Sequence, residues 1–143
     1  MGYTHYWSFG KGSDKDEEGF NKALPIIRDI CNRHKDIIVR ESDEDLPPDI
    51  NEEYHFIRFN GIEDDGHETF LFELTSGDFN FCKTARKPYD LPVCECLIVL
   101  AAHIPSVTIS SDGFGRGNGY DGKWETAIRN VKELYGIEFS RTD

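Results

Sequence analysis

The stretch from Leu91 to Ile104 constrains the fold most, because Glu95 and His103 are its only strongly polar side chains. Pro92 is tolerated in the first turn of a helix, and Asp90 is predicted to cap its start. A helix that is apolar on nearly every side must be buried by the rest of the chain. We therefore expect this segment at the structural centre of the protein.

Shorter runs with strand or helix periodicity surround this segment. Alternating aromatic residues predict a first strand, and turn signals between three further runs predict an antiparallel meander. The predicted strands cover residues 3–9, 54–60, 68–74, 79–84 and 107–111, with the meander formed by the middle three. Apolar residues at helical spacing predict amphipathic helices over 16–34 and 124–134. The pattern predicts an α+β fold, in which about three helices pack on one face of a mostly antiparallel sheet and leave part of the other face free.

Chain length and two loop-like segments set the expected domain organisation. At 143 residues, the chain fits a single domain over residues 1–143. Seven acids and two prolines between residues 41 and 53 predict a solvated acidic loop. A cation site there would lack the ordered ligand spacing of an EF-hand loop. Glycines between residues 112 and 122 predict a flexible turn, because too few residues follow for the βαβ unit that a dinucleotide fingerprint needs.

Charge and hydropathy exclude several classes of partner. The formal net charge is -11, with 27 Asp and Glu against 16 Lys and Arg, and this charge repels an extended nucleic acid. No apolar run reaches the roughly 20 residues that span a bilayer. The first seven residues lack the features of a signal peptide, so we expect a cytoplasmic protein. Its cysteines are then expected to be reduced, buried thiols: Cys31, Cys82, Cys94 and Cys96.

Three cations stand out from this acidic background. Lys83, Arg86 and Lys87 lie within five positions, directly before the apolar helix that begins near Asp90. The first amides of a helix carry a partial positive charge, and Arg and Lys add charge-assisted hydrogen bonds to an anion. The segment therefore predicts a site for a carboxylate or a phosphate.

The indications of catalysis are weaker. His67-Glu68-Thr69 satisfies the H-x-T element of two-histidine phosphoesterases, but the required second copy is absent. His5 and His67 are nevertheless the histidines that a strand and a turn would present for proton transfer. No motif for a nucleophilic serine, a zinc site or another cofactor occurs in the sequence. The sequence leaves open whether the protein is an enzyme, and it favours binding without a metal or cofactor.

Four separated motifs carry a resemblance that covers most of the chain. They are Met1-Gly2-Tyr3-Thr4-His5-Tyr6-Trp7, His67-Glu68-Thr69-Phe70, the run from Phe81 to Leu91, and Ser110-Ser111-Asp112-Gly113. In this order they resemble a widespread group of small uncharacterised proteins of bacteriophages and bacteria. The resemblance implies a phage context and supplies no reaction. This chain departs from the group after Gly113, where it inserts glycine-rich residues before Trp124.

Taken as one pocket, these motifs supply the three kinds of contact that a nucleotide needs. Aromatic rings stack on a base, cations hold phosphate, and hydroxyl or carboxylate groups bond ribose or an exocyclic amine. The predicted ligand-binding residues are Tyr3, His5, Tyr6, Trp7, His67, Lys83, Thr84, Arg86, Lys87, Ser110 and Asp112. The structural alternative is that Tyr3 and Trp7 belong to the core and that Lys83 and Arg86 form ion pairs.

The leading hypothesis is a phage-type protein that binds and sequesters a small anionic nucleotide in the bacterial host cell. An immune signalling nucleotide, either a cyclic oligonucleotide or an ADP-ribose derivative, would fit this role. Two alternatives stay open: a phosphodiesterase that uses His5 and His67 as acid and base, and an acidic module that engages a basic host protein. A sheet with an open face would also allow a homo-oligomer.

Overall fold

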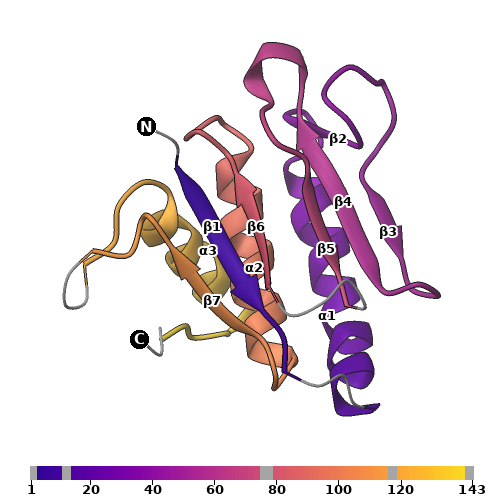
Figure 1. The fold of residues 1–143 in the computed structure, drawn as a ribbon, viewed down its shortest axis with the longest axis vertical. Helices are drawn as coiled ribbons and strands as arrows, with labels where there is room; N and C mark the ends of the chain where they lie inside the picture. The colour runs from indigo at the N-terminus through magenta and orange to yellow at the C-terminus, as the bar shows by residue number, and fades with distance from the viewer. Residues whose placement is uncertain (1–2, 11–13, 75–78, 116–118, 141–143) are drawn as a thin grey trace.

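The computed structural model describes residues 3–10, 14–74, 79–115 and 119–140. Its elements follow the chain in the order β1 (Thr4–Ser8), α1 (Asp14–Arg33), β2 (Ile38–Val39), β3 (Asp49–Asn51), β4 (Phe56–Gly61), the short 3-10 helix η1 (Glu63–Asp65), β5 (Phe70–Glu73), β6 (Phe79–Lys83), α2 (Asp90–His103), β7 (Thr108–Ser111) and α3 (Trp124–Tyr135). The strands lie in front in Figure 1, and the three α-helices of the described residues lie behind them.

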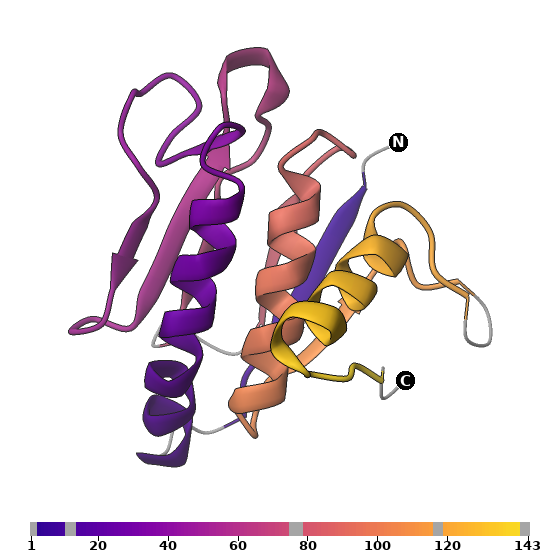
Figure 2. The same ribbon diagram turned by 180° about the vertical axis from the view of Figure 1, so that it is seen from behind.

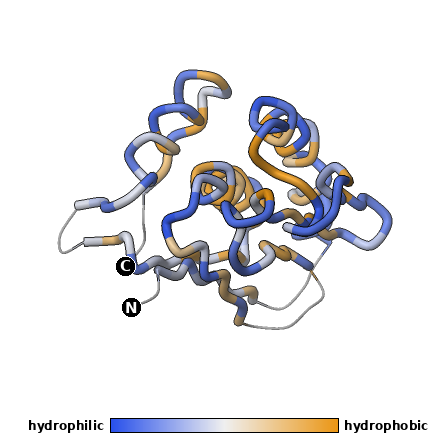
Figure 3. Tube along the Cα trace, turned by 90° about the horizontal axis from the view of Figure 1, so that it is seen from above, coloured by the Kyte–Doolittle hydropathy of each residue, from blue (hydrophilic) through white to orange (hydrophobic). Residues whose placement is uncertain are grey.

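The predicted α+β class is confirmed. Every strand pair is antiparallel, and the helices pack on one face of the strands, as the view from behind shows (Figure 2). Seen from above, the strands form one layer and the helices the other (Figure 3). One sheet has the order β6-β1-β7, and a second consists of β2, β3 and β5 around β4.

The predicted meander is wrong at its last strand. β5 pairs with β4 as expected, but β6 pairs with β1 at the other end of the sequence. The two sheets instead meet at Glu68, whose backbone N donates to the Lys83 carbonyl at 3.2 Å. The Tyr89 hydroxyl also donates to the carbonyl oxygen of Glu68, at 2.5 Å. Turn signals between neighbouring segments therefore did not determine which strands pair.

Helix α2 is the buried centre that its composition predicts. It lies between α1 and α3 (Figure 2), and the β6-β1-β7 sheet covers it on the side turned to the viewer in Figure 1. Its side chains at Val93, Leu97 and Leu100 are fully buried. Gly19 lets α1 approach closely, because a Cβ at this position would collide with the His103 carbonyl of α2. Pro25 lies inside α1, which begins at Asp14 and continues to Arg33.

Glu95 connects the three helices from the middle of α2. Its fully buried carboxylate accepts hydrogen bonds from Arg33 at 2.8 Å and from Asn130 of α3 at 2.9 Å. His34, directly after α1, lies 2.9 Å from the same carboxylate. Because these partners satisfy the buried charge, one polar group in an apolar helix fixes the positions of its neighbours.

The two predicted loops are only partly irregular. Within the acidic segment 41–53, residues 49–51 form strand β3 and pair with β4, because the hydrophobic Ile50 lies opposite Ile57. In the glycine-rich segment 112–122, Phe114 and Tyr120 form an isolated antiparallel bridge, and residues 116–118 lie outside the described residues. None of the described helices combines the length and the apolar character of a membrane span.

Candidate functional site

The register of β6, β1 and β7 divides the predicted site residues between two faces of one sheet. Side chains alternate along a strand, so neighbouring residues point to opposite faces. On β1, His5 and Trp7 are buried on the helix side, whereas Tyr6 and Ser8 remain partly exposed. The expectation of a single pocket is therefore wrong, because the predicted residues lie on both sides of the sheet.

The outer face, which we define as the face turned away from the helices, is formed by a grid of cross-strand neighbours. Tyr6 lies opposite Phe81 on one side and opposite Ser110 on the other. In the next row, Ser8 lies opposite Phe79 and Thr108. No helix of the described chain covers this face, which is turned to the viewer in Figure 1.

Aromatic rings dominate the outer face. The side chains of Phe79 and Phe81 are 63% and 49% exposed, although they belong to a strand in the middle of the fold. The Tyr6 and Phe79 rings are stacked, with 6.0 Å between their centroids. Beside them is a depression of about 220 Å³ that Tyr6, Phe79, Ser110 and Thr108 help to line. Two exposed aromatic residues and the partly exposed Tyr6 in one patch form a surface that favours an apolar or aromatic partner.

Polar groups flank the aromatic patch at the end of the sheet where β1 begins. Lys83 is exposed on the outer face, two residues along the strand from Phe81. Asp112 accepts hydrogen bonds from the Tyr6 hydroxyl at 3.0 Å and from the backbone N of Thr4 at 3.1 Å. Among the predicted residues, the outer face thus brings together Tyr6, Lys83, Ser110 and Asp112.

The turn that follows β6 has a strained backbone. Ala85 and Arg86 both have left-handed conformations, with φ values of 53° and 59°, and the Lys87 backbone N closes the turn on the Thr84 carbonyl at 3.0 Å. Two consecutive left-handed residues other than glycine are unfavourable and require support from their surroundings. Contacts of the Arg86 side chain provide such support.

The predicted cations serve different roles in this turn. Arg86 places its guanidinium over the Tyr3 ring, and its Nη2 lies 2.7 Å from the Asp121 carboxylate. The pKa of Asp121 is below its ordinary value, chiefly because of the hydrogen bond from Arg86. Lys87 donates to the Asp64 carbonyl at 2.9 Å. Lys83 forms no ion pair within the described part of the chain, so it is the cation that remains available to a ligand.

The expected anion site at the start of α2 is filled by the chain itself. Asp90 is the first residue of α2 and is fully buried, and its side chain does not cap the helix as the sequence predicted. Instead, Asp90 Oδ1 accepts a hydrogen bond from the Thr84 hydroxyl at 2.5 Å. A carboxylate next to the first turn already gains from the helix dipole. An external anion would therefore meet a negative charge at this helix end.

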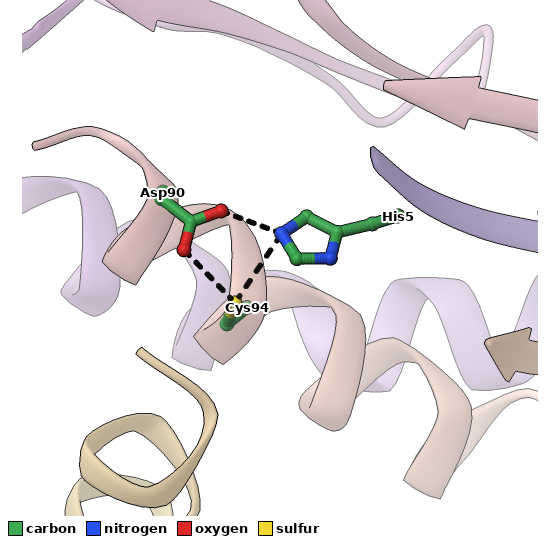
Figure 4. A group of neighbouring side chains, drawn as sticks. All are labelled: His5, Asp90 and Cys94. Atoms are coloured by element: carbon green, nitrogen blue, oxygen red, sulfur yellow. Dashed lines mark hydrogen bonds and ion pairs between the residues drawn. The ribbon is translucent and has the colours of Figure 1, made fainter. Parts of the chain in front are cut away.

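Buried polar side chains on the inner face form a connected network around His5 (Figure 4). His5 Nε2 lies 2.5 Å from Asp90 Oδ1, and His5 Nδ1 lies 2.7 Å from the Ser111 hydroxyl. The Ser111 oxygen also accepts hydrogen bonds from the Gly113 backbone N and from the Trp124 indole N, each at 2.9 Å. The network joins β1, β7 and the starts of α2 and α3.

Hydrogen-bond capacity determines which nitrogen of His5 carries a proton. Two donors already use the two lone pairs of the Ser111 oxygen, so its own proton is directed at His5 Nδ1. His5 Nδ1 is then an acceptor, and Nε2 carries the imidazole proton and donates it to Asp90. The assignment gives a neutral imidazole between a hydroxyl and a carboxylate.

The remaining predicted residues are in the core or distant from the aromatic patch. Trp7 is 1% exposed, and its ring packs against Phe70 and Phe72. Thr84 is buried in the inner network. His67 lies before β5, where its backbone N donates to Asn60 Oδ1 at 3.0 Å. The structure thus gives His5 and His67 separate sets of partners.

Sequence reasoning did not select several residues that the geometry brings together. Phe79 and Phe81 were predicted only to form a strand, although their alternation with Asn80 and Cys82 places them on the same face as Lys83. Cys94 stands in no motif, and Ser111 was not selected as a site residue although it lies in the motif from Ser110 to Gly113, because both meet His5 only through tertiary packing.

Comparisons with protein-family models, with curated proteins and with solved structures found no significant match to this chain. The geometry of the outer face and of the buried network around His5 is therefore the basis for the proposals that follow.

Proposed function

We propose that the protein binds a small nucleotide on the outer face of the β6-β1-β7 sheet. The observation that carries this proposal is the exposure of Tyr6, Phe79 and Phe81 together, next to Lys83, on a sheet face without a covering helix. Apolar patches of this kind on a protein surface mark contact sites. Here the patch combines aromatic rings with a cation, as nucleotide recognition requires.

Each part of a nucleotide would have a matching group. A base stacked on Phe81 or Phe79 would gain about 1–3 kcal/mol from an aromatic side chain. Two residues along a strand cover about 6.6 Å, so Lys83 lies at a suitable distance to bond the phosphate of a base stacked on Phe81. Ser110 on β7 and Asp112 directly after it lie across β1 from Phe81 and would bond ribose hydroxyls or an exocyclic amine.

Capture without turnover is the form of this function that we favour. The phosphodiesterase alternative needs His5 and His67 to act on the same bond. Yet His5 is fully buried, with Ser111 and Asp90 on its two nitrogens, and His67 lies at the other sheet. Sequestration of an immune signal in a phage-infected cell is the biological role that the sequence resemblance suggests.

Isothermal titration calorimetry against mononucleotides, cyclic di- and oligonucleotides and ADP-ribose tests the proposal. We expect heat with at least one of these compounds, and chromatography should recover that compound intact. Phe81→Ala and Lys83→Ala should each weaken binding by about tenfold or more. Tyr54→Ala and Lys22→Ala are matched controls, because these side chains are 64% and 67% exposed away from the outer face.

Two results would contradict the proposal. Absence of heat with every compound would remove nucleotide binding altogether. The second such result is a wild-type protein that sediments as a dimer and that Phe81→Ala converts to a monomer, with no nucleotide effect. That outcome would assign the aromatic patch to a subunit interface.

A further inference from the structure

A second cluster, on the inner face of the same sheet, carries a different chemistry. His5, Asp90 and Cys94 are each fully buried, and each directs a possible metal ligand to a common point (Figure 4). Asp90 and Cys94 are one turn apart on α2, and His5 faces them from β1. Cys94 Sγ lies 3.6 Å from His5 Nε2 and 3.8 Å from Asp90 Oδ2.

These separations suit a tetrahedral metal ion. Bonds of about 2.0–2.3 Å in tetrahedral geometry hold neighbouring ligand atoms about 3.2–3.8 Å apart. The distances from Cys94 Sγ to Asp90 Oδ2 and to His5 Nε2 already fall in this range. An ion bound through Oδ2 would replace the hydrogen bond between His5 and Asp90 Oδ1, and Oδ1 would keep its hydrogen bond from Thr84.

The charge of the cluster also favours a cation. With the proton of His5 on Nε2, the groups bonded to the Asp90 carboxylate are a neutral imidazole, the Thr84 hydroxyl and the Cys94 thiol. Burial of a carboxylate among neutral donors is costly.

We propose that His5 Nε2, Asp90 Oδ2 and Cys94 Sγ form a binding site for a zinc ion. Imidazole, thiolate and carboxylate are the donors that zinc takes in proteins, so these side chains would supply three of its usual four ligands. Binding releases the Cys94 thiol proton, and the imidazole proton moves from Nε2 to Nδ1. The two negative charges of thiolate and carboxylate then balance the charge of the ion in its buried site.

Two of the proposed ligands already have a second hydrogen-bond partner each. Thr84 fixes the Asp90 carboxylate, and Ser111 lies 2.7 Å from His5 Nδ1. To accept the relocated imidazole proton, the Ser111 hydroxyl turns away from Nδ1 and its oxygen gives up the hydrogen bond from the Gly113 backbone N or from the Trp124 indole N. Outer partners of this kind orient metal ligands and increase affinity. The zinc site shares none of its three ligands with the outer face, so its test is independent of nucleotide binding.

Cobalt(II) chloride is the probe, added to reduced, chelator-treated protein. We expect one equivalent to give the visible absorption of tetrahedral cobalt together with a thiolate-to-cobalt charge-transfer band in the ultraviolet. Zinc chloride should displace the cobalt and raise the melting temperature. Cys94→Ser should abolish the charge-transfer band, whereas Cys31→Ser, at a buried thiol on α1, should retain it.

The wild-type spectrum decides the question even if Cys94→Ser fails to fold. Weak octahedral cobalt absorption without a charge-transfer band would overturn the proposal, and the cluster would then be a hydrogen-bond network only. A charge-transfer band lost in Cys31→Ser but retained in Cys94→Ser would also overturn it, because the metal would then lie at a different cysteine.

Discussion

The guanidinium of Arg86 lies over the Tyr3 ring, with its Cζ atom 4.1 Å from the ring centroid. Its Nη2 also bonds Asp121, and both charged side chains are more than half exposed, at 52% and 62%. Exposed ion pairs contribute little to stability, because solvent screens them. Arg86 therefore connects the turn after β6 to the loop that carries Asp121, but it contributes little to the free energy of unfolding.

For Arg86→Ala we expect a melting temperature only slightly below that of the wild type and a nucleotide affinity that is nearly unchanged. Arg129→Ala, at an exposed arginine of α3, provides the control for the loss of a surface charge. Calorimetry of the two variants beside Lys83→Ala checks the assignment. A loss of affinity in Arg86→Ala as large as in Lys83→Ala would show that both cations contact the phosphate.

Ala85→Gly should stabilise the protein. Ala85 has a φ of 53°, a left-handed conformation that costs an alanine about 1–2 kcal/mol and costs glycine nothing sterically. Part of this gain is offset by the greater freedom of glycine in the unfolded chain, so we expect an increase of up to about 1 kcal/mol in the free energy of unfolding. Urea denaturation measures it.

The same substitution at Ala101, within α2, is the control. There glycine replaces alanine in a right-handed helix, and the free energy of unfolding should fall by about 1 kcal/mol. A decrease at both positions would mean that the turn at Ala85 is not strained.

Gly113→Ala should destabilise the protein through Tyr3. A Cβ at Gly113 would overlap the Tyr3 hydroxyl and lie 2.7 Å from Trp124 Cδ1. Overpacking of this kind costs about 1–3 kcal/mol. Tyr3→Phe removes the hydroxyl, so the double variant Gly113→Ala/Tyr3→Phe should recover part of the loss. Additive effects of the two substitutions in thermal denaturation would contradict this contact.

Acid should weaken the contacts through which the Glu95 carboxylate connects α2 with α1 and α3. Burial raises the pKa of this carboxyl, but hydrogen bonds from His34 and Asn130 and the charges of His34 and Arg33 outweigh burial and lower it. A lowered pKa in the folded state stabilises the fold above the ordinary value of 4.5, and this contribution is lost as the pH falls through the folded pKa.

Glu95→Gln should therefore be less stable than the wild type at pH 7, by about 2–3 kcal/mol, and the difference should shrink in acid. The cost is moderate because Arg33 reaches solvent once its partner is removed. Glu133→Gln changes an exposed carboxylate on α3 and is the control. Denaturation curves at pH 7 and at successively lower pH check the prediction, and a constant difference at all pH values would contradict it.

The elements that the sequence predicted best are those whose composition alone determines their environment. Helix α2 followed from an almost uninterrupted apolar run, and α1 and α3 from their amphipathic spacing. The pairing of β4 with β5 followed, but the partner of β6 did not, because β6 meets β1 through residues 71 to 79 positions apart. Short-range turn signals contain no information about such pairings.

The candidate sites were predictable only in part for a similar reason. Alternation along a strand already places Tyr6 on the opposite face from His5 and Trp7, so the two faces could have been separated from the sequence. The cluster of His5, Asp90 and Cys94 could not, because it depends on the rotation of α2 against β1. A cysteine in an apolar helix gives no signal of which side chain it will face.

The contact at Glu68 joins the edges of two separate sheets within the strand layer. Between β5 and β6 the continuous ladder of a sheet is replaced by a few hydrogen bonds, to Lys83, Cys82 and Tyr89. When the hydrogen bonds of Glu68 break, each sheet keeps the hydrogen bonds between its own strands. Opening of the native fold should therefore start along this line, and amide hydrogen exchange at Glu68 and Lys83 should be faster than at the paired residues of β1 and β4.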